Sequence, residues 1–203
     1  PSPTGCLHLG GVRTVLYNYL FAKKHGGDFL LRIEDTDQSR STDDSIQAIL
    51  DGMRWVKLDW DEGPFRQTER MDLYREHAMR LFEQGHAYWC VCSSEELEAR
   101  RKAAETKGGS PKYDGRCRNL GLTKPTGEAA LRFRAPQDGQ TVVDDLIKGP
   151  VVFDNQILDD VIILRSNGYP TYNFSVVVDD ALMGITHVVR GDDHLTNTPR
   201  QIP

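Results

Sequence analysis

The first eleven residues, Pro-Ser-Pro-Thr-Gly-Cys-Leu-His-Leu-Gly-Gly, constrain this chain more than any other segment. A proline-punctuated turn places His8 shortly before Gly10 and Gly11, and the apolar spacing over residues 12–24 then predicts a helix. Backbone N–H groups at the start of a helix attract anions, and glycine lets a ligand approach the backbone closely. The segment therefore predicts a nucleotide-phosphate site, although a helix-capping histidine beside a tight glycine turn would look the same. Its spacing matches neither the Rossmann dinucleotide fingerprint nor the P-loop.

The composition is that of a soluble globular protein. The chain has 203 residues, of which 38% are hydrophobic and 27% charged, so we expect one or two domains with a real core. No apolar run reaches the ~18 residues of a membrane span, so we expect no membrane partner. Four cysteines do not indicate a disulfide scaffold and favour a cytoplasmic location. The net charge of −5 excludes a surface that is basic throughout, but a local patch can still hold nucleic acid.

The sequence pattern divides the chain into three segments. Residues 1–70 are predicted to contain a turn, a helix, a strand and a helix, which is half of a nucleotide-binding sheet. Residues 71–160 combine helices, a Cys-x-Cys pair, a polar stretch and short strands. Residues 161–203 return to the character of buried strands.

The periodicity also predicts individual elements. Strands are expected at residues 28–33, 131–134, 141–143, 151–153, 161–164 and 176–178. A capping signal at residues 41–44 begins a helix that runs to about residue 56, with one apolar face made by Ile46, Ile49, Leu50 and Met53. Further helices are expected at residues 73–84, ending at Gly85, and from Glu95 onward.

Ordered motifs resemble those of one enzyme family. The opening Pro-Ser-Pro-Thr-Gly-x-x-His-x-Gly resembles the first signature of class I aminoacyl-tRNA synthetases in its glutamate-specific form, with Gly11 in place of the last histidine of His-Ile-Gly-His. Further blocks follow in the family's order at residues 32–37, 58–64, 113–117, 169–173, 178–180 and 190–195. The chain thus resembles the N-terminal catalytic part of a bacterial-type glutamyl-tRNA synthetase, from residue 1 to residue 201.

The resemblance implies a fold and an activity. The fold would be α/β, a class I Rossmann-like parallel sheet interrupted by an α+β acceptor-stem-binding insertion. Residues 1–70 and 161–203 would belong to the two halves of the catalytic domain, and residues 71–160 to the insertion. The activity would be ATP-dependent ligation of L-glutamate to tRNA(Glu) through a glutamyl-adenylate, with Mg²⁺ accompanying ATP, by a monomer. Because the Lys-rich second signature lies outside these 203 residues, the chain alone is expected to be inactive.

Site residues are assigned by the same resemblance. His8 and Gly10 would serve catalysis, and ATP would contact Thr4, His8, Gly10, Gly11 and Asp193. Glutamate would be held by Ser2, Glu34, Tyr172 and Arg190. Activation needs no side-chain nucleophile, so these groups would act by positioning and charge stabilisation.

Two roles are implied within the glutamate set. Glu34 and Ser2 would bind the α-ammonium, and Arg190 and Tyr172 would bind carboxylates, for which guanidinium is the best-matched side chain. Each residue also has a plainer interpretation. Glu34 fits a solvated loop, Tyr172 a core aromatic, and Arg190 an exposed ion pair.

Three cysteines form a candidate metal site. Cys90, Cys92 and Cys117 supply thiolates, which suit tetrahedral zinc, but a structural site needs a fourth ligand. Where the family's bacterial zinc form has a histidine, this chain has Asn119. The family's short paralogue, which glutamylates a queuosine-modified tRNA(Asp), uses a tyrosine at the position of Tyr113. Structural Zn²⁺ and reduced, unligated thiols both remain open.

Basic residues gather between residues 100 and 118. They are Arg100, Arg101, Lys102, Lys107, Lys112, Arg116 and Arg118. A charge run is usually a solvated face, but in this family the segment would contact the tRNA acceptor end. Two rival functions fit less of the chain: the short paralogue, and a nucleotidyltransferase of the same superfamily, which would not need Glu34, Tyr172 or Arg190.

Overall fold

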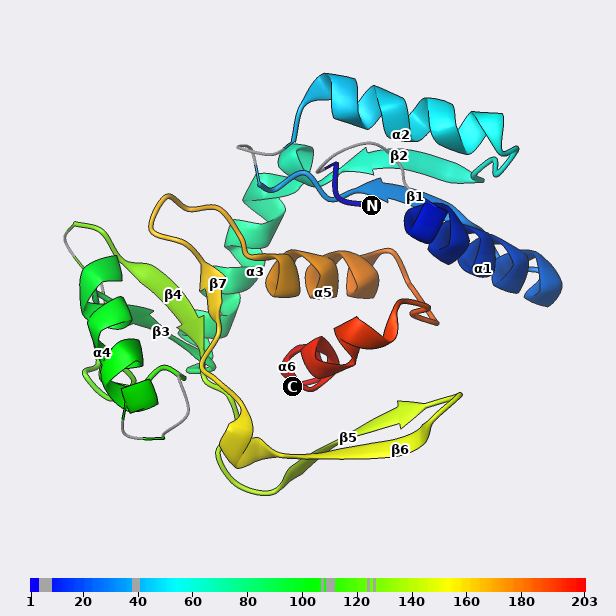
Figure 1. The fold of residues 1–203 in the computed structure, drawn as a ribbon. Coiled ribbons are helices and arrows are strands. Elements are labelled where there is room, and N and C mark those ends of the chain that lie inside the picture. Colours follow the sequence, from blue (N-terminus) through cyan, green and yellow to red (C-terminus); the bar gives the residue numbers. More distant parts are fainter. Residues whose placement is uncertain (4–8, 38–40, 107, 109–111, 124, 126) are drawn as a thin grey trace. The chain divides into compact units, whose positions relative to one another are not determined.

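A computed structural model describes residues 1–3, 9–37, 41–106, 108, 112–123, 125 and 127–203. The chain divides into two compact units. The first contains Pro1–Met71 and Asp179–His194, and the second contains Asp72–Val178 and Leu195–Pro203. Figure 1 labels the helices and strands of both units.

The first unit is a parallel βαβ arrangement preceded by a helix. In chain order its elements are α1 (Leu9–His25), β1 (Leu30–Ile33), α2 (Asp43–Trp55), β2 (Glu62–Arg66) and the 3₁₀ turn η1 (Gln67–Arg70). β1 pairs with β2 in parallel, with a register shift between Leu30 and Arg32. In Figure 1, α2 runs along this pair of strands, as expected for a crossover helix.

Local sequence signals explain α2 and its packing. The Thr42 side chain accepts a hydrogen bond from the Ser45 N–H and caps the helix at the predicted place. Four turns later the helix ends near Trp55. Three of the four predicted apolar residues are buried, and Leu50 is partly buried against them. They form one core cluster with side chains of β1 and of Phe29 just before it: Phe29, Leu31, Ile33, Ile46, Ile49 and Met53.

Asp61 ties α1 to the start of β1. Its two oxygens each lie 2.8 Å from Lys23 Nζ, at the end of α1. The same carboxylate accepts from the Phe29 N–H at 2.8 Å, and the Asp61 N–H donates back to the Phe29 carbonyl. The turn before β1 is therefore held by an acidic residue that comes after α2 in sequence.

The second unit combines helices with antiparallel strands. Its elements are α3 (Met71–Glu83), β3 (Ala87–Cys90), α4 (Ser94–Thr106), β4 (Ala130–Phe133), β5 (Gln140–Asp145), β6 (Gly149–Asp154), the turn η2 (Asn155–Ile157), β7 (Ile162–Leu164), α5 (Tyr172–Leu182), the turn η3 (Asp192–Asn197) and α6 (Thr198–Gln201). The last residues of α5 and the first of η3 belong to the first unit. The strand order is β3-β4-β7, and β5 and β6 pair only with each other, as the hairpin in Figure 1 shows.

β7 leads directly into α5. Leu164 forms a bridge with Pro170, and the Thr171 N–H donates to the Ile163 carbonyl at 3.0 Å. The Thr171 hydroxyl donates to the Ile162 carbonyl at 2.6 Å. The chain therefore folds back on β7 immediately before Tyr172 begins α5.

Most predicted elements are confirmed, but one is wrong. Strands appear at β1, β4, β5, β6 and β7, and helices at α1 to α4, within a few residues of the predicted bounds. Residues 176–178 were predicted to form a strand and lie inside α5 instead. A run of three valines cannot distinguish a buried strand from a buried helix, and Val176 and Val178 are buried on α5. β2 and β3 were not predicted.

Within the described residues, no helix is long and apolar enough to cross a membrane.

The Asp61 contacts predict a pH-dependent contribution to stability. The Lys23 ammonium, followed by the Phe29 N–H, lowers the pKa of Asp61. A lowered pKa means that the ionised carboxylate stabilises the folded state above its unfolded pKa of about 4, and that this contribution is lost as the pH falls through the folded-state pKa. The difference in unfolding free energy between wild type and Asp61→Asn should therefore shrink from pH 6 to pH 2.

Urea unfolding at each pH measures this difference. Asp59→Asn, an exposed carboxylate two residues away, is the control because it leaves the Lys23 and Phe29 contacts in place. A difference for Asp61→Asn that stays constant over the whole pH range would contradict the assignment.

Candidate functional site

The carboxyl end of β1 leads into Glu34, Asp35 and Asp37, the acidic residues of the motif at residues 32–37. The Glu34 N–H donates to the Pro1 carbonyl at 2.9 Å, so the segment 1–3 runs beside the end of the strand. This contact brings exposed Ser2 and half-buried Glu34 to the same strand end. α/β sheets bind ligands at the carboxyl ends of their parallel strands. Two of the residues that are predicted to bind glutamate therefore lie at the expected edge of the sheet.

Asp35 in the same block has a structural role. It is 1% exposed and accepts three hydrogen bonds: from the Thr68 N–H at 2.9 Å, from the Thr68 hydroxyl at 2.8 Å and from Arg66 Nε at 3.0 Å. Since its lone pairs are occupied, Asp35 fastens β1 to the segment after β2. Glu34 is left as the carboxylate next to it that a ligand could reach.

Arg32 connects Glu34 to two acids of α5. Arg32 and Glu34 are two residues apart on a strand and so point to the same face. One terminal nitrogen of the guanidinium lies 3.4 Å from Glu34 and the other 2.8 Å from Asp180, and Nε lies 3.6 Å from Asp179. Burial raises the pKa of Asp180, and the Arg32 charge opposes this shift. Arg32 therefore joins the end of β1 to the last part of α5.

Asp179 is the centre of a buried polar network. Its side chain is fully buried and accepts from Gln67 Nε2 at 2.8 Å and from Arg70 Nε at 2.9 Å. Gln67 is also fully buried. Sequence reasoning assigned no role to Asp179, although two adjacent acids at the end of an apolar run were a signal for buried ion pairs.

The predicted ATP residues lie at the start of α1 and in η3. Gly10 and Gly11 lie in the first turn of α1, the end of the helix toward which backbone N–H groups point. Asp193 is exposed in η3, with one oxygen 3.7 Å from His194 Nε2. Thr4 and His8 lie outside the described residues.

The other two residues that are predicted to bind glutamate, Tyr172 and Arg190, lie in different units. Arg190 is half-buried in the irregular segment before η3, in the first unit. Tyr172 is the first residue of α5 and belongs to the second unit.

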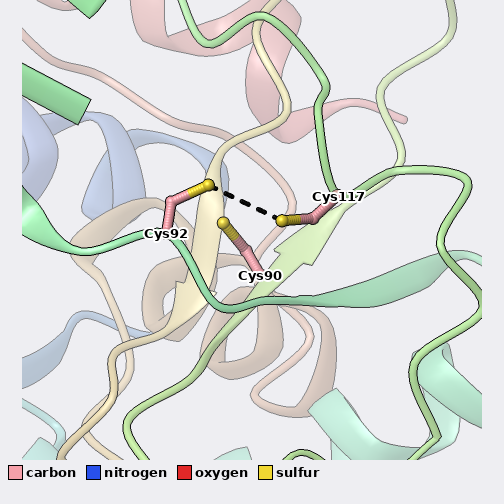
Figure 2. Close-up of side chains that lie close together, drawn as sticks. All are labelled: Cys90, Cys92 and Cys117. Atoms are coloured by element: carbon pink, nitrogen blue, oxygen red, sulfur yellow. Dashed lines mark hydrogen bonds between the residues drawn. The ribbon is translucent and has the colours of Figure 1, made fainter. Parts of the chain in front are cut away.

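Three cysteines of the second unit converge, as Figure 2 shows. The Sγ atoms of Cys90, Cys92 and Cys117 lie within 4.8 Å of one another, and those of Cys92 and Cys117 are 3.6 Å apart. Cys90 ends β3, Cys92 follows it, and Cys117 lies in the turn of residues 116–119. Tetrahedral zinc with bonds of about 2.3 Å separates two sulfurs by about 3.8 Å, so the spacing fits one ion.

Tyr113 supplies a fourth donor to this cluster. Its hydroxyl oxygen lies 3.4 Å from the Cys90 Sγ and 3.8 Å from the Cys92 Sγ, and it accepts from the Cys117 N–H at 2.9 Å. Asn119, at the family's usual histidine position, is exposed. The donor set that the chain brings together is therefore three sulfurs and a phenol oxygen.

The thiols differ in acidity. Burial raises the pKa of Cys92 to about 11, and its hydrogen bond with Cys117 adds to the shift. Burial opposes ionisation of Cys90 too, but its interactions with the Tyr113 hydroxyl, the Cys92 backbone and the Arg132 guanidinium outweigh it and lower the pKa of Cys90. Burial raises the pKa of Tyr113, which keeps its hydroxyl protonated near neutral pH. A metal ion would bind these groups by displacing protons from the thiols.

Buried Asp160 braces the turn that carries Cys117. It accepts from the Tyr88 hydroxyl at 2.6 Å and from the Ala135 N–H at 3.0 Å, and it forms an ion pair with Arg118. The Arg118 side chain also donates to the Ala135 carbonyl at 3.0 Å. These bonds join the residue after Cys117 to β3 and to the chain after β4.

The basic residues of the 100–118 stretch are mostly paired with acids. The pairs are Arg100–Asp114, Arg101–Glu105 at 3.2 Å, Lys102–Glu98 at 3.4 Å and Arg116–Glu96 at 3.1 Å. Lys112 donates to the Gln156 carbonyl at 2.5 Å, and Lys107 lies outside the described residues. Beside α4, a cavity of about 320 Å³ is lined by Arg100, Arg101, Lys112, Arg132, Glu98 and Asp159, among others. Exposed pairs are weak, so phosphates could replace these carboxylates.

Comparison with known proteins places this geometry in a family. The family model described as "tRNA synthetases class I (E and Q), catalytic domain" matches residues 1–203. The chain belongs to this synthetase family. Glutamate–tRNA ligases of Syntrophobacter fumaroxidans and Geobacter sulfurreducens are 59% and 60% identical over 202 residues, which are 100% of this chain and 43% of each relative.

Solved structures of glutamate-specific synthetases have a similar fold. A glutamate tRNA ligase from Elizabethkingia meningosepticum in complex with its amino acid has a TM-score of 0.91 and 36% identity, covering 100% of this chain and 44% of that chain. A glutamate-tRNA synthetase from Elizabethkingia anophelis gives the same TM-score and identity. The predicted α/β class I synthetase fold is therefore confirmed, and the chain spans less than half the length of the relatives that it matches.

In this synthetase domain, Asp179 should contribute strongly to stability. Asp179→Ala leaves Gln67, Arg70 and Arg32 without a buried acceptor, and breaking such a network costs roughly 3–5 kcal/mol of unfolding free energy. Asp72→Ala is the matched control, because Asp72 also pairs with an arginine but is 98% exposed, and such pairs contribute about 0–1 kcal/mol. Urea unfolding compares the two variants. Equal losses would show that burial of the network adds nothing.

Proposed function

We propose that the protein containing this chain ligates L-glutamate to tRNA(Glu) with ATP, through a glutamyl-adenylate. The observation that carries the proposal is the identity of about 59% to glutamate–tRNA ligases over the whole chain. The cytoplasm as its location and a monomeric state are part of the same proposal.

Glutamate activation transfers the adenylyl group of ATP, through its α-phosphorus, to the amino acid. An oxygen of the glutamate α-carboxylate attacks this phosphorus, and pyrophosphate leaves. Glu34 and Ser2, brought together at the end of β1, are proposed to hold the α-ammonium. Arg190 and Tyr172 are proposed to hold the carboxylates. Because a guanidinium left without its carboxylate is costly, this arrangement would disfavour glutamine.

The ATP contacts are proposed for Thr4, His8, Gly10, Gly11 and Asp193. The N–H groups in the first turn of α1 would bind phosphate oxygens, and His8 would donate a hydrogen bond near them. Mg²⁺ bound with ATP would neutralise charge on the leaving pyrophosphate. Arg32 and Asp180 would keep the Glu34 carboxylate in place for the ammonium.

Glu34→Gln in the full-length protein tests the glutamate site. The amide keeps the shape of the side chain but loses the charge that would pair with the ammonium, so the KM for glutamate should rise about tenfold or more, with the KM for ATP unchanged. The measurement is ATP–pyrophosphate exchange with glutamate or glutamine, with and without tRNA. Glu83→Gln, an exposed residue at the end of α3, is the control.

Three results would contradict parts of the proposal. Equal changes in the KM of glutamate and ATP would remove Glu34 from the ammonium site. Exchange with glutamate in the absence of tRNA would favour the short queuosine-tRNA paralogue. Exchange with neither amino acid would favour a nucleotidyltransferase of the same superfamily.

We also infer a structural Zn²⁺ held by Cys90, Cys92, Cys117 and Tyr113. Three thiols and a phenol oxygen within reach of one point suit zinc better than a harder ion. The ion would cross-link the end of β3 to the turn that carries Cys117. In this family that segment, with Arg100, Arg101, Lys102, Lys107, Lys112 and Arg116, is proposed to face the acceptor stem of the tRNA.

The zinc inference predicts one zinc ion per chain and a specific role for Tyr113. Tyr113→Phe should weaken zinc binding more than about tenfold, because loss of even an outer-shell contact typically costs 10–100-fold. Competition with a chromophoric chelator measures the affinity. Asn119→Ala and Tyr17→Phe are controls, since both positions are exposed and should bind zinc like wild type. An Asn119→Ala protein weaker than Tyr113→Phe would assign the fourth ligand to Asn119 instead.

A further inference from the structure

Arg132 is a buried cation in the middle of β4. It is 5% exposed and lies between two apolar residues of the strand, Leu131 and Phe133. Burying a guanidinium costs several kcal/mol unless opposite charge or good hydrogen bonds compensate it. The surroundings of this residue therefore have to supply a negative charge or a full set of hydrogen-bond acceptors.

The protein groups around Arg132 do not supply that charge in direct contact. One terminal nitrogen donates to the Asp160 main-chain carbonyl at 2.7 Å, and Nε is buried without a hydrogen-bond partner. Among the described residues, no carboxylate oxygen lies within the 4.0 Å of an ion pair with Arg132. The Asp160 carboxylate is engaged by Arg118 and Tyr88, and Asp159 accepts from the Tyr113 N–H at 3.1 Å.

The strand register places Arg132 at the cysteine cluster. In the β3–β4 pair, Tyr88 lies opposite Arg132 and Cys90 lies opposite Ala130. Cys90 and Arg132 are therefore diagonal neighbours on one face of the sheet, within reach of a long side chain. The guanidinium carbon lies 3.8 Å from the centre of the Tyr113 ring, whose hydroxyl lies 3.4 Å from the Cys90 Sγ.

We propose that Arg132 is the built-in counter-charge of the metal centre. A Zn²⁺ ion with three thiolates carries one net negative charge when the tyrosine ligand is neutral, and one buried guanidinium balances it. The inference rests on the proposed zinc site. It explains why a cation is kept in a buried strand without an ion-pair partner among the described residues.

An arginine suits this place better than a lysine for a geometric reason. The planar guanidinium stacks on the Tyr113 ring, which holds the ring in the orientation that points its hydroxyl at the thiols. Arg132 thus positions the fourth ligand and balances the single net negative charge of the metal centre. It contacts no metal itself and is a positioning residue.

Zinc affinity of full-length variants tests the proposal. Arg132→Met should weaken zinc binding about 10–100-fold, the usual range for groups outside the ligand shell, and Arg132→Lys should lose less because it keeps the charge. Arg165→Met is the matched control. Arg165 lies just after β7 and is exposed, so the Arg165→Met protein should bind zinc within about twofold of wild type.

The outcomes separate this inference from the zinc site itself. A wild-type protein without zinc overturns both. A wild-type protein with one zinc and an Arg132→Met protein of equal affinity overturns the counter-charge alone, and so do equal losses in Arg132→Met and Arg132→Lys, which indicate packing. If Arg132→Met does not fold, Arg132→Gln takes its place, because the amide keeps a hydrogen-bond donor for the Asp160 carbonyl.

Discussion

The buried carboxylate of Asp179 fixes the strand end on which the proposed glutamate site depends. Gln67 and Arg70 donate to it from the segment after β2, and Arg32 approaches it from β1. Two parallel strands are a small sheet, and such a pair gains little stability from its own ladder. An acceptor on α5 that two other segments share supplies the rigidity that the short strands lack. Arg32, which is held by this arrangement, in turn pairs with Glu34 and orients its carboxylate.

The second unit uses the same device for a different purpose. Asp160 is buried and receives bonds from Tyr88 on β3, from Ala135 after β4 and from Arg118 beside Cys117. In both units, one aspartate collects donors from segments far apart in sequence. The first unit thereby holds the carboxylate that is proposed to bind the ammonium, and the second holds the thiols that are proposed to bind zinc. The two proposed sites differ in chemistry, but each is supported by a buried aspartate.

Local signals predicted the parts of the fold that depend on near neighbours. The Thr42 cap, the apolar face of α2 and the end of β1 at the acidic block are all short-range features, and the structure has them. The cysteine cluster was also expected, because thiol ligands are recognisable one by one. The valines of residues 176–178 were assigned to a strand because a short apolar run carries no period. Asp179, Asp160 and Arg132 were missed since their partners lie far away in sequence, as Gln67 does from Asp179, and no pattern in a single sequence records such pairs.

The passage from Asp160 to α5 has a mechanical consequence. β7 begins just after Asp160, and the chain folds back on it through the Leu164–Pro170 bridge and the two Thr171 hydrogen bonds. The next residue is Tyr172, a proposed glutamate contact. Asp160, which braces the cysteine turn, and Tyr172, which begins α5, are thus the two ends of one short segment that is fixed by backbone hydrogen bonds. A change of shape at the proposed zinc site would therefore reach Tyr172 along the covalent chain, without any contact between the metal ion and the amino acid.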